Sequence, residues 1–181
     1  MDVWSQQENY DDIANKSNEE QEAILSEAHG RLDKFKERGT EVEFMRMLTS
    51  EAAAQIPDNS LDFVYVDARH DYCGVKEDME LYWPKLKEGG ILAGHDYVQP
   101  VSWEKMGQDW TLCGDGSRRP LAVLGAVNDF AAKADLQVIV PPFDWEFKSF
   151  LIRKPLTQCG GGGGRGASAG AQAVEAALAS D

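Results

Sequence analysis

The sequence predicts an α/β protein: a mostly parallel β-sheet with helices on both faces, closed by an antiparallel hairpin at its C-terminal end. Strand-like and helix-like segments alternate along much of the chain, which is typical of a parallel sheet. The segment 61–66, LDFVYV, is apolar at nearly every position, as expected for a strand covered on both faces. The chain has 181 residues, 43% of them hydrophobic, which is enough for one domain with a sizeable core.

The first predicted helix occupies residues 18–38. Ser17 and Glu20 have the spacing of a capping box, in which each side chain accepts a hydrogen bond from the other residue's backbone N–H. Gly39 can take the left-handed conformation that ends a helix. Apolar side chains at helical spacing predict its buried face: Ile24, Ala28, Leu32 and Phe35.

The middle of the chain predicts a strand–helix–strand unit. A strand at 42–47 and a short helix at 49–55 precede it, and the strand at 61–66 begins it. Glycines at 89–90 end the following helix, and a second strand follows at 91–93. Helical spacing predicts the buried face of that helix: Val75, Met79, Tyr82, Trp83 and Leu86.

The C-terminal part predicts one more helix and the hairpin. After a long irregular segment at 98–116, Ser117 is predicted to cap a helix, and strands at 137–140 and 147–152 follow. The predicted buried face of the helix is Leu121, Leu124, Val127 and either Phe130 or Ala131. The Gly- and Ala-rich composition after this point predicts one domain at 1–156 and a disordered tail at 157–181.

Charge and cysteine content exclude several classes of function. The net charge of −13 argues against a nucleic-acid partner, which usually needs a basic face. No apolar run approaches the length of a membrane span, and the N-terminus lacks the pattern of a signal peptide, so a cytoplasmic protein is expected. Three cysteines without CxxC spacing argue against a zinc site and a disulfide framework, and favour reducing surroundings.

Acidic and histidine side chains follow both strands of the strand–helix–strand unit. Asp67, His70 and Asp71 follow the first strand, and His95 and Asp96 follow the second. The carboxyl ends of parallel strands meet at one edge of a sheet, where ligands bind. Such residues can hold a divalent cation such as Mg²⁺ or act as a general base. Alternatively, they cap the next helix and satisfy loop backbone groups.

The segments LDFVYVDARHDY and WPKLKEGGILAGHDY resemble the central part of class I S-adenosylmethionine-dependent methyltransferases, in their small-molecule group. The resemblance extends over roughly residues 1–154, and GGILAGHDY is its most specific phrase. It implies a Rossmann-like sheet, S-adenosylmethionine as the cofactor and a small-molecule acceptor.

The resemblance also implies roles for the residues after the two strands. In the related catechol-type O-methyltransferases, aspartates after strands four and five bind the metal ion. Matched by position, these are Asp67 and Asp96, with His95 as a further candidate ligand, and Tyr97 stands where that group has Asn.

The base of that group lies three residues after the strand-four aspartate. In this sequence the position is occupied by His70, whose imidazole is expected to be neutral enough at pH 7 to take a proton from a hydroxyl. Asp71 is expected to orient His70 or to join the site.

The cofactor is expected to contact five residues. Asp2 resembles the acidic residue at the end of strand two that binds the ribose hydroxyls, and the turn of Leu48, Thr49 and Ser50 resembles the adenine-contacting turn. Asp67 is expected to contact the cofactor as well as the metal ion. For Leu48, ordinary core packing is an equal alternative.

The first strand and the glycine-rich cofactor loop of the family are not found before Asp2, so the sequence resembles an N-terminally truncated member. Two main hypotheses follow. One is methyl transfer to a small-molecule hydroxyl, assisted by Mg²⁺ or by histidine. The other is an inactive fragment that serves as a binding or interaction module and self-associates through exposed sheet edges. A metal-dependent hydrolase is a weaker third hypothesis.

Overall fold

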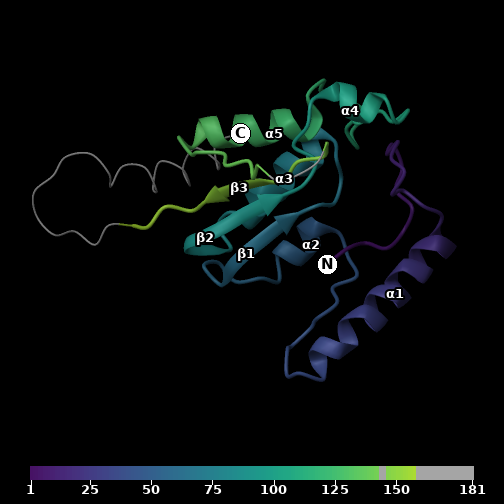
Figure 1. Ribbon diagram of the computed structural model, residues 1–181, viewed down its shortest axis with the longest axis vertical. Helices are drawn as coiled ribbons and strands as arrows, with labels where there is room; N and C mark the ends of the chain where they lie inside the picture. Colours follow the sequence, from purple (N-terminus) through teal and green to yellow (C-terminus); the bar gives the residue numbers. More distant parts are fainter. Residues whose placement is uncertain (143–145, 158–181) are drawn as a thin grey trace, which may run out of the picture.

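The computed structural model describes residues 1–142 and 146–157 and confirms the α/β class (Figure 1). Along the chain its elements are α1 (Asn18–Lys36), α2 (Thr49–Ala53), β1 (Leu61–Val66), α3 (Tyr72–Tyr82), β2 (Leu86–Gly94), α4 (Pro100–Glu104), α5 (Ala122–Lys133) and β3 (Phe150–Arg153). Both α4 and the irregular backbone around it lie in the predicted long segment at 98–116.

The sheet has the order β1-β2-β3. β1 pairs with β2 in parallel, and β2 pairs with β3 in an antiparallel manner. Because α3 connects β1 to β2, the carboxyl ends of these two strands lie at the same edge. Gly94 ends β2 between Val66 and Phe150, and a Cβ atom there would lie 2.5 Å from the Val66 carbonyl oxygen and 2.6 Å from the Phe150 ring. Only glycine allows the three strands to approach this closely at the edge.

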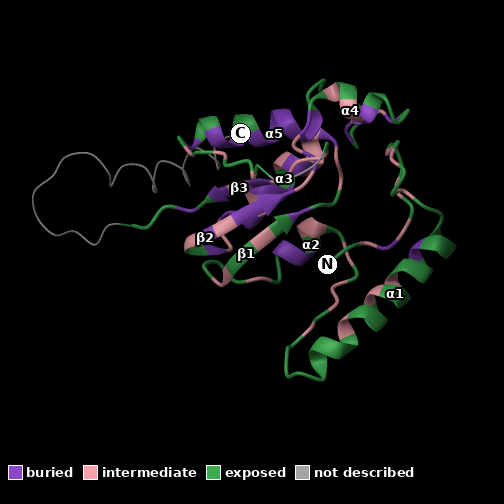
Figure 2. Cartoon of the chain, in the orientation of Figure 1, coloured by how far each residue is buried: buried purple, intermediate pink, exposed green. Residues whose placement is uncertain are grey.

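The main core lies between the sheet and the helices α3 and α5, which Figure 1 shows on one side of the strands. Trp83, the C-cap residue of α3, packs edge-on against Phe130 of α5, with ring centroids 5.4 Å apart. On the other face of β1, Phe63 and Tyr65 remain 54% and 47% exposed. Figure 2 shows the same contrast between the buried strands β2 and β3 and the exposed part of β1.

Two predicted strands are reduced to single bridges. The segment 42–47 has one parallel bridge, from Arg46 to Asp2, and 137–140 has one antiparallel bridge, from Ile139 to Leu151. A strand needs a neighbour along its whole length, and the neighbour of 42–47 is only the short segment around Asp2. The predicted strand at 147–152 forms as β3, shifted to Phe150–Arg153.

The predicted helix ends are confirmed in part. In α1, the Ser17–Glu20 capping box is present, with Glu20 N donating to Ser17 Oγ at 3.3 Å and Ser17 N donating to Glu20 Oε2 at 3.1 Å. The prediction that Ser117 caps α5 was wrong, because α5 begins at Ala122 without a side-chain cap. Ser117 instead stands in a turn, where its backbone N–H donates to Asp115.

The predicted buried face of α1 was also wrong. Ile24 is 43% exposed and Phe35 is 38% exposed, and Gln21 is the buried residue of this helix. Figure 1 shows the reason: α1 stands away from the sheet, so its apolar side chains have no sheet surface to pack on. In α5, by contrast, the predicted face is buried at Leu124, Val127, Phe130 and Ala131, and only Leu121 is exposed.

Cys73 and Cys113 form a disulfide that joins the first turn of α3 to the segment after α4. The prediction that the cysteines stay unpaired was therefore wrong for these two, and they do not support reducing surroundings. Their separation of 40 residues leaves no local sign of pairing in the sequence. Cys159 and the predicted tail beyond Thr157 lie outside the described residues. Among the described helices, none has the length and apolar character needed to cross a membrane.

Candidate functional site

The residues after β1 and β2 converge at the sheet edge as the sequence predicts. Asp67, His95 and Asp96 each offer one ligand atom, and these atoms lie within 4.8 Å of one another. Asp96 is 6% exposed and has a φ of +61°, a left-handed conformation that aspartate tolerates better than most residues. Its carboxylate lies 3.1 Å from His70 Nε2 and 3.4 Å from His95 Nδ1.

His70 lies between three carboxylates. Its Nε2 is 3.1 Å from Asp96 Oδ2 and 3.6 Å from Asp67 Oδ1, and its Nδ1 is 2.8 Å from Asp12 Oδ2. Burial lowers the pKa of His70, but the hydrogen bonds and charges of these three carboxylates outweigh it and raise the pKa to about 10. The expectation that His70 is neutral at pH 7 is therefore not met in this structure.

No sequence pattern indicated Asp12, which lies in a polar loop 58 residues before its partner. Its side chain is 2% exposed. Burial raises the pKa of Asp12, but the hydrogen bonds with His70 and the Ala14 N–H outweigh this effect, so the pKa lies below the usual range. Trp110 covers the imidazole, with ring centroids 4.5 Å apart.

Asp71 occupies a different place from the one predicted beside His70. It is 1% exposed and is the N-cap of α3, where its Oδ1 accepts from Gly74 N at 3.0 Å. Its Oδ2 accepts from Arg69 Nε at 2.6 Å. Both oxygens therefore serve the local fold, which is the helix-capping alternative for this residue.

The donor set at the edge fits a divalent cation. Two carboxylates, Asp67 and Asp96, and the imidazole of His95 converge, and carboxylate oxygens are the ligands that Mg²⁺ prefers. Burial raises the pKa of Asp96, although His70 and His95 act in the opposite direction, so a cation beside it would be stabilising. Tyr97 is not part of this set, because its hydroxyl donates to Asn128 Oδ1 at 2.7 Å.

A cavity of about 500 Å³ opens beside Asp67. It is lined by all five residues that the sequence assigns to the cofactor: Asp2, Leu48, Thr49, Ser50 and Asp67. The volume lies within the range of small-molecule sites. Asp67 is thus shared between the cavity and the carboxylate cluster, which places the two features side by side.

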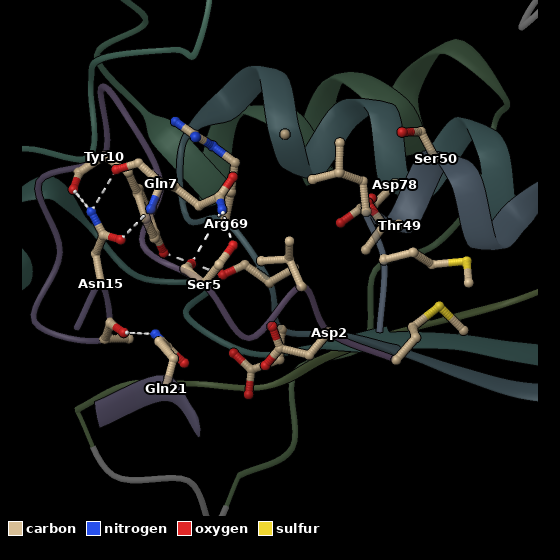
Figure 3. Close-up of a pocket in the computed structure, with 18 of the residues that line it drawn as sticks. Asp2, Ser5, Gln7, Tyr10, Asn15, Gln21, Thr49, Ser50, Arg69 and Asp78 are labelled. Atoms are coloured by element: carbon tan, nitrogen blue, oxygen red, sulfur yellow. Dashed lines mark hydrogen bonds between the residues drawn. The ribbon is translucent and has the colours of Figure 1, made fainter. Parts of the chain in front are cut away.

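The N-terminal loop and helix α3, which are distant in sequence, form two walls of the cavity (Figure 3). On one side, Asn15 accepts from Gln7 N at 2.8 Å and donates to Tyr10 O at 2.7 Å, which fixes the N-terminal loop. On the other side, Asp78 of α3 lies beside Thr49 and is 4% exposed. Burial raises the pKa of Asp78 to about 6. No motif indicated Asp78, because it lies inside an otherwise ordinary amphipathic helix.

A family model and two solved structures are similar to this chain. A family model described as a methyltransferase domain matches residues 2–97. A solved structure from Corynebacterium glutamicum is 18% identical with a TM-score of 0.50, covering 73% of this chain and 58% of that one. An O-methyltransferase family protein from Burkholderia thailandensis is 15% identical with a TM-score of 0.50, covering 72% of this chain and 41% of that one. At these identities the two structures support the fold.

An uncharacterized protein of Sinorhizobium fredii, y4gI, is 41% identical over 58 residues, which are 30% of this chain and 6% of that protein. The chain therefore spans a small part of this relative and about half the length of the two solved structures. The family model nevertheless covers more than half of the chain and includes β1, α3, β2 and both strand ends that carry the site. By this match, with the fold that the solved structures share, the chain belongs to the methyltransferase domain family.

Proposed function

We propose that this chain binds S-adenosylmethionine in the cavity beside Asp67 and transfers its methyl group to a hydroxyl of a small-molecule acceptor. One observation carries the proposal. The five residues assigned to the cofactor from the sequence line a single cavity, and one of them, Asp67, also stands 3.6 Å from His70 Nε2. A methyl donor in the cavity would then lie next to groups that can handle a proton.

The cavity suits the polar and apolar parts of this cofactor. Asp2 Oδ1 accepts from Trp4 N at 3.0 Å, which holds the carboxylate in place, and its further lone pairs can accept from two ribose hydroxyls. Leu48 is 47% exposed and offers an apolar surface to the base. Thr49 and Ser50 add hydroxyls at the start of α2. The exposure of Leu48 favours a ligand contact over the alternative of core packing.

The chemistry needs alignment and the removal of one proton. The acceptor oxygen attacks the methyl carbon, the bond from carbon to sulfur breaks, and the products are a methyl ether, S-adenosylhomocysteine and a proton. His70 is the candidate base. With a pKa of about 10 it is protonated at neutral pH, so proton acceptance by His70 is expected to grow as the pH rises toward 10.

Mg²⁺ is the second part of the proposal. Asp67, His95 and Asp96 would hold the ion, and its positive charge would lower the pKa of an acceptor hydroxyl. The same two carboxylates contact His70 Nε2, so the imidazole and a cation share one acidic site.

The test is a transfer assay with methyl-labelled S-adenosylmethionine and a panel of phenols, catechols and hydroxy acids, from pH 7 to 10, with and without Mg²⁺. His70→Gln is expected to lower kcat about 100-fold while cofactor affinity is kept. Asp62→Asn is the matched control, because Asp62 is an exposed β1 carboxylate paired with Lys87 at 2.8 Å. A wild-type chain that binds the cofactor but methylates nothing in the panel would contradict the proposal.

A second candidate function is an interaction module that self-associates through the sheet. The observation in its favour is the exposure of Phe63 and Tyr65, which stack with ring centroids 6.3 Å apart on β1. Light scattering after size exclusion would show a dimer that Phe63→Ser/Tyr65→Ser converts to a monomer. A monomeric wild-type chain at all concentrations would exclude this candidate.

A further inference from the structure

The imidazole of His70 is fixed by a residue that lies 58 positions earlier in the chain. Asp12 Oδ2 lies 2.8 Å from His70 Nδ1, and Asp12 Oδ1 accepts from Ala14 N at 2.7 Å. Both oxygens are thus engaged, and the side chain is 2% exposed. The two nitrogens of an imidazole point in different directions, so a carboxylate that accepts from Nδ1 does not also reach Nε2. Nδ1 is therefore committed to Asp12.

This commitment decides which nitrogen faces the sheet edge beside the cavity. With Nδ1 bound to Asp12, Nε2 points to the sheet edge, 3.1 Å from Asp96 Oδ2 and 3.6 Å from Asp67 Oδ1. Asp67 lines the cavity, so Nε2 is the nitrogen on the side where an acceptor would meet the methyl donor.

The loop around Asp12 is itself fastened to the residues that cover His70. Gln108 Oε1 accepts from Ile13 N at 3.1 Å and from Trp110 Nε1 at 3.1 Å. Trp110 in turn packs on the imidazole, with ring centroids 4.5 Å apart. Two chain segments thus hold the ring, one through its nitrogen and one through its face. An arrangement needed only for packing would not require a buried, fully bonded carboxylate at Nδ1.

We propose that Asp12 is a positioning residue for methyl transfer. It accepts from His70 Nδ1–H and so holds Nε2 toward the reacting hydroxyl. This inference rests on the proposed function, because it assigns His70 the handling of the acceptor proton. Asp12 does not line the cavity, unlike its neighbours Ile13 and Ala14, so it acts through His70 rather than on the cofactor.

The kinetic test uses Asp12→Ala and Asp12→Asn in the full chain. In Asp12→Ala, kcat is expected to fall about 100-fold, while the Kd for S-adenosylmethionine and the KM for the acceptor change less than about threefold. Asn keeps an oxygen that can accept from Nδ1–H, so Asp12→Asn is expected to recover about tenfold of the lost kcat. Asp11→Ala is the matched control on the same loop, because Asp11 is exposed and pairs with Asp109 through its backbone only.

A second readout does not need activity. The Nδ1–H proton of His70 is expected to give a slowly exchanging nitrogen-15-coupled NMR signal in the wild type and in Asp12→Asn, and to lose it in Asp12→Ala. If the wild type methylates no acceptor, the proposed function fails. The Nδ1–H signal then still tests whether Asp12 holds the imidazole of His70. An unchanged His70 signal in Asp12→Ala, or a wild-type kcat in a folded Asp12→Asn or Asp12→Ala, would overturn the inference.

Discussion

The carboxylate of Asp71 binds the guanidinium of Arg69, with Oδ2 2.6 Å from Nε, while its other oxygen caps α3 at Gly74 N. The guanidinium continues the link, because Arg69 Nη2 donates to Asn9 O at 3.0 Å. Asp71 thus ties the start of α3 to the N-terminal loop. It stands next to His70 in sequence, but its two carboxylate oxygens accept from Arg69 and Gly74.

Replacing Asp71 is expected to reduce stability rather than to change chemistry. Asp71→Ala removes an N-cap and the partner of the partly buried Arg69 guanidinium, so the free energy of unfolding should fall by about 2–4 kcal/mol. Asp71→Asn keeps the cap and should lose less. Urea unfolding of both variants checks this. A folded Asp71→Asn that binds cofactor normally but has lost methyl transfer would instead support a direct role in the site.

Gly94 is expected to be irreplaceable at the strand edge. An added Cβ would lie 2.5 Å from the Val66 carbonyl oxygen, so Gly94→Ala should cost at least about 1–3 kcal/mol through displaced backbone. Gly30→Ala is the control, since nothing lies within 4 Å of the added atom and the helix should gain about 0.5–1 kcal/mol. Thermal unfolding of the two variants compares them. Equal stability of Gly94→Ala and the wild type would contradict the close packing of β1, β2 and β3.

The sequence predicts well those features that depend on local pattern. The β1–α3–β2 unit follows from an apolar strand, helical spacing and two glycines, and topology then brings Asp67, His95 and Asp96 together. The predicted cofactor residues also line one cavity, with Asp67 directly after β1 and Thr49 and Ser50 at the start of α2.

Features that depend on distant contacts could not be predicted in this way. The pairing of Asp12 with His70 and the disulfide from Cys73 to Cys113 join segments 58 and 40 residues apart without any periodic signal. The pKa of His70 depends on three carboxylates from three segments. The face of α1 has the right spacing for burial, but its exposure depends on where the whole helix lies.

Asp78 is expected to make stability depend on pH between about 4 and 6. Its pKa is raised from 3.8 to about 6 by burial, so the folded state binds the proton more tightly than the unfolded state. Ionisation of Asp78 therefore destabilises the fold as the pH rises through this window. Asp78→Asn should match the wild type near pH 4 and be more stable above pH 6, by about 3 kcal/mol at most. Urea midpoints from pH 4 to 7 measure the difference, and a constant difference across this range would contradict the raised pKa.

The disulfide is expected to stabilise the domain chiefly by restricting the unfolded chain. For a closed loop of 40 residues, reduction should lower the free energy of unfolding by about 3–4 kcal/mol. The double variant Cys73→Ser/Cys113→Ala should show a similar loss and no further response to dithiothreitol. Unfolding curves with and without the reductant test this. A wild type that unfolds identically in both conditions would show that the bond contributes nothing.

The central claim is that the cavity beside Asp67 holds S-adenosylmethionine, and titration calorimetry of this chain with the cofactor tests it most directly. The expected result is binding of one molecule per chain with a Kd between about 1 µM and 1 mM, as for the substrates of most enzymes. Asp2→Ala should weaken binding about tenfold, since it removes a carboxylate acceptor for the ribose hydroxyls. Asp62→Asn, which changes a carboxylate outside the cavity, should leave the Kd unchanged. No heat of binding to the folded wild-type chain, or an affinity that Asp2→Ala leaves unaltered, would contradict the assignment of this cavity.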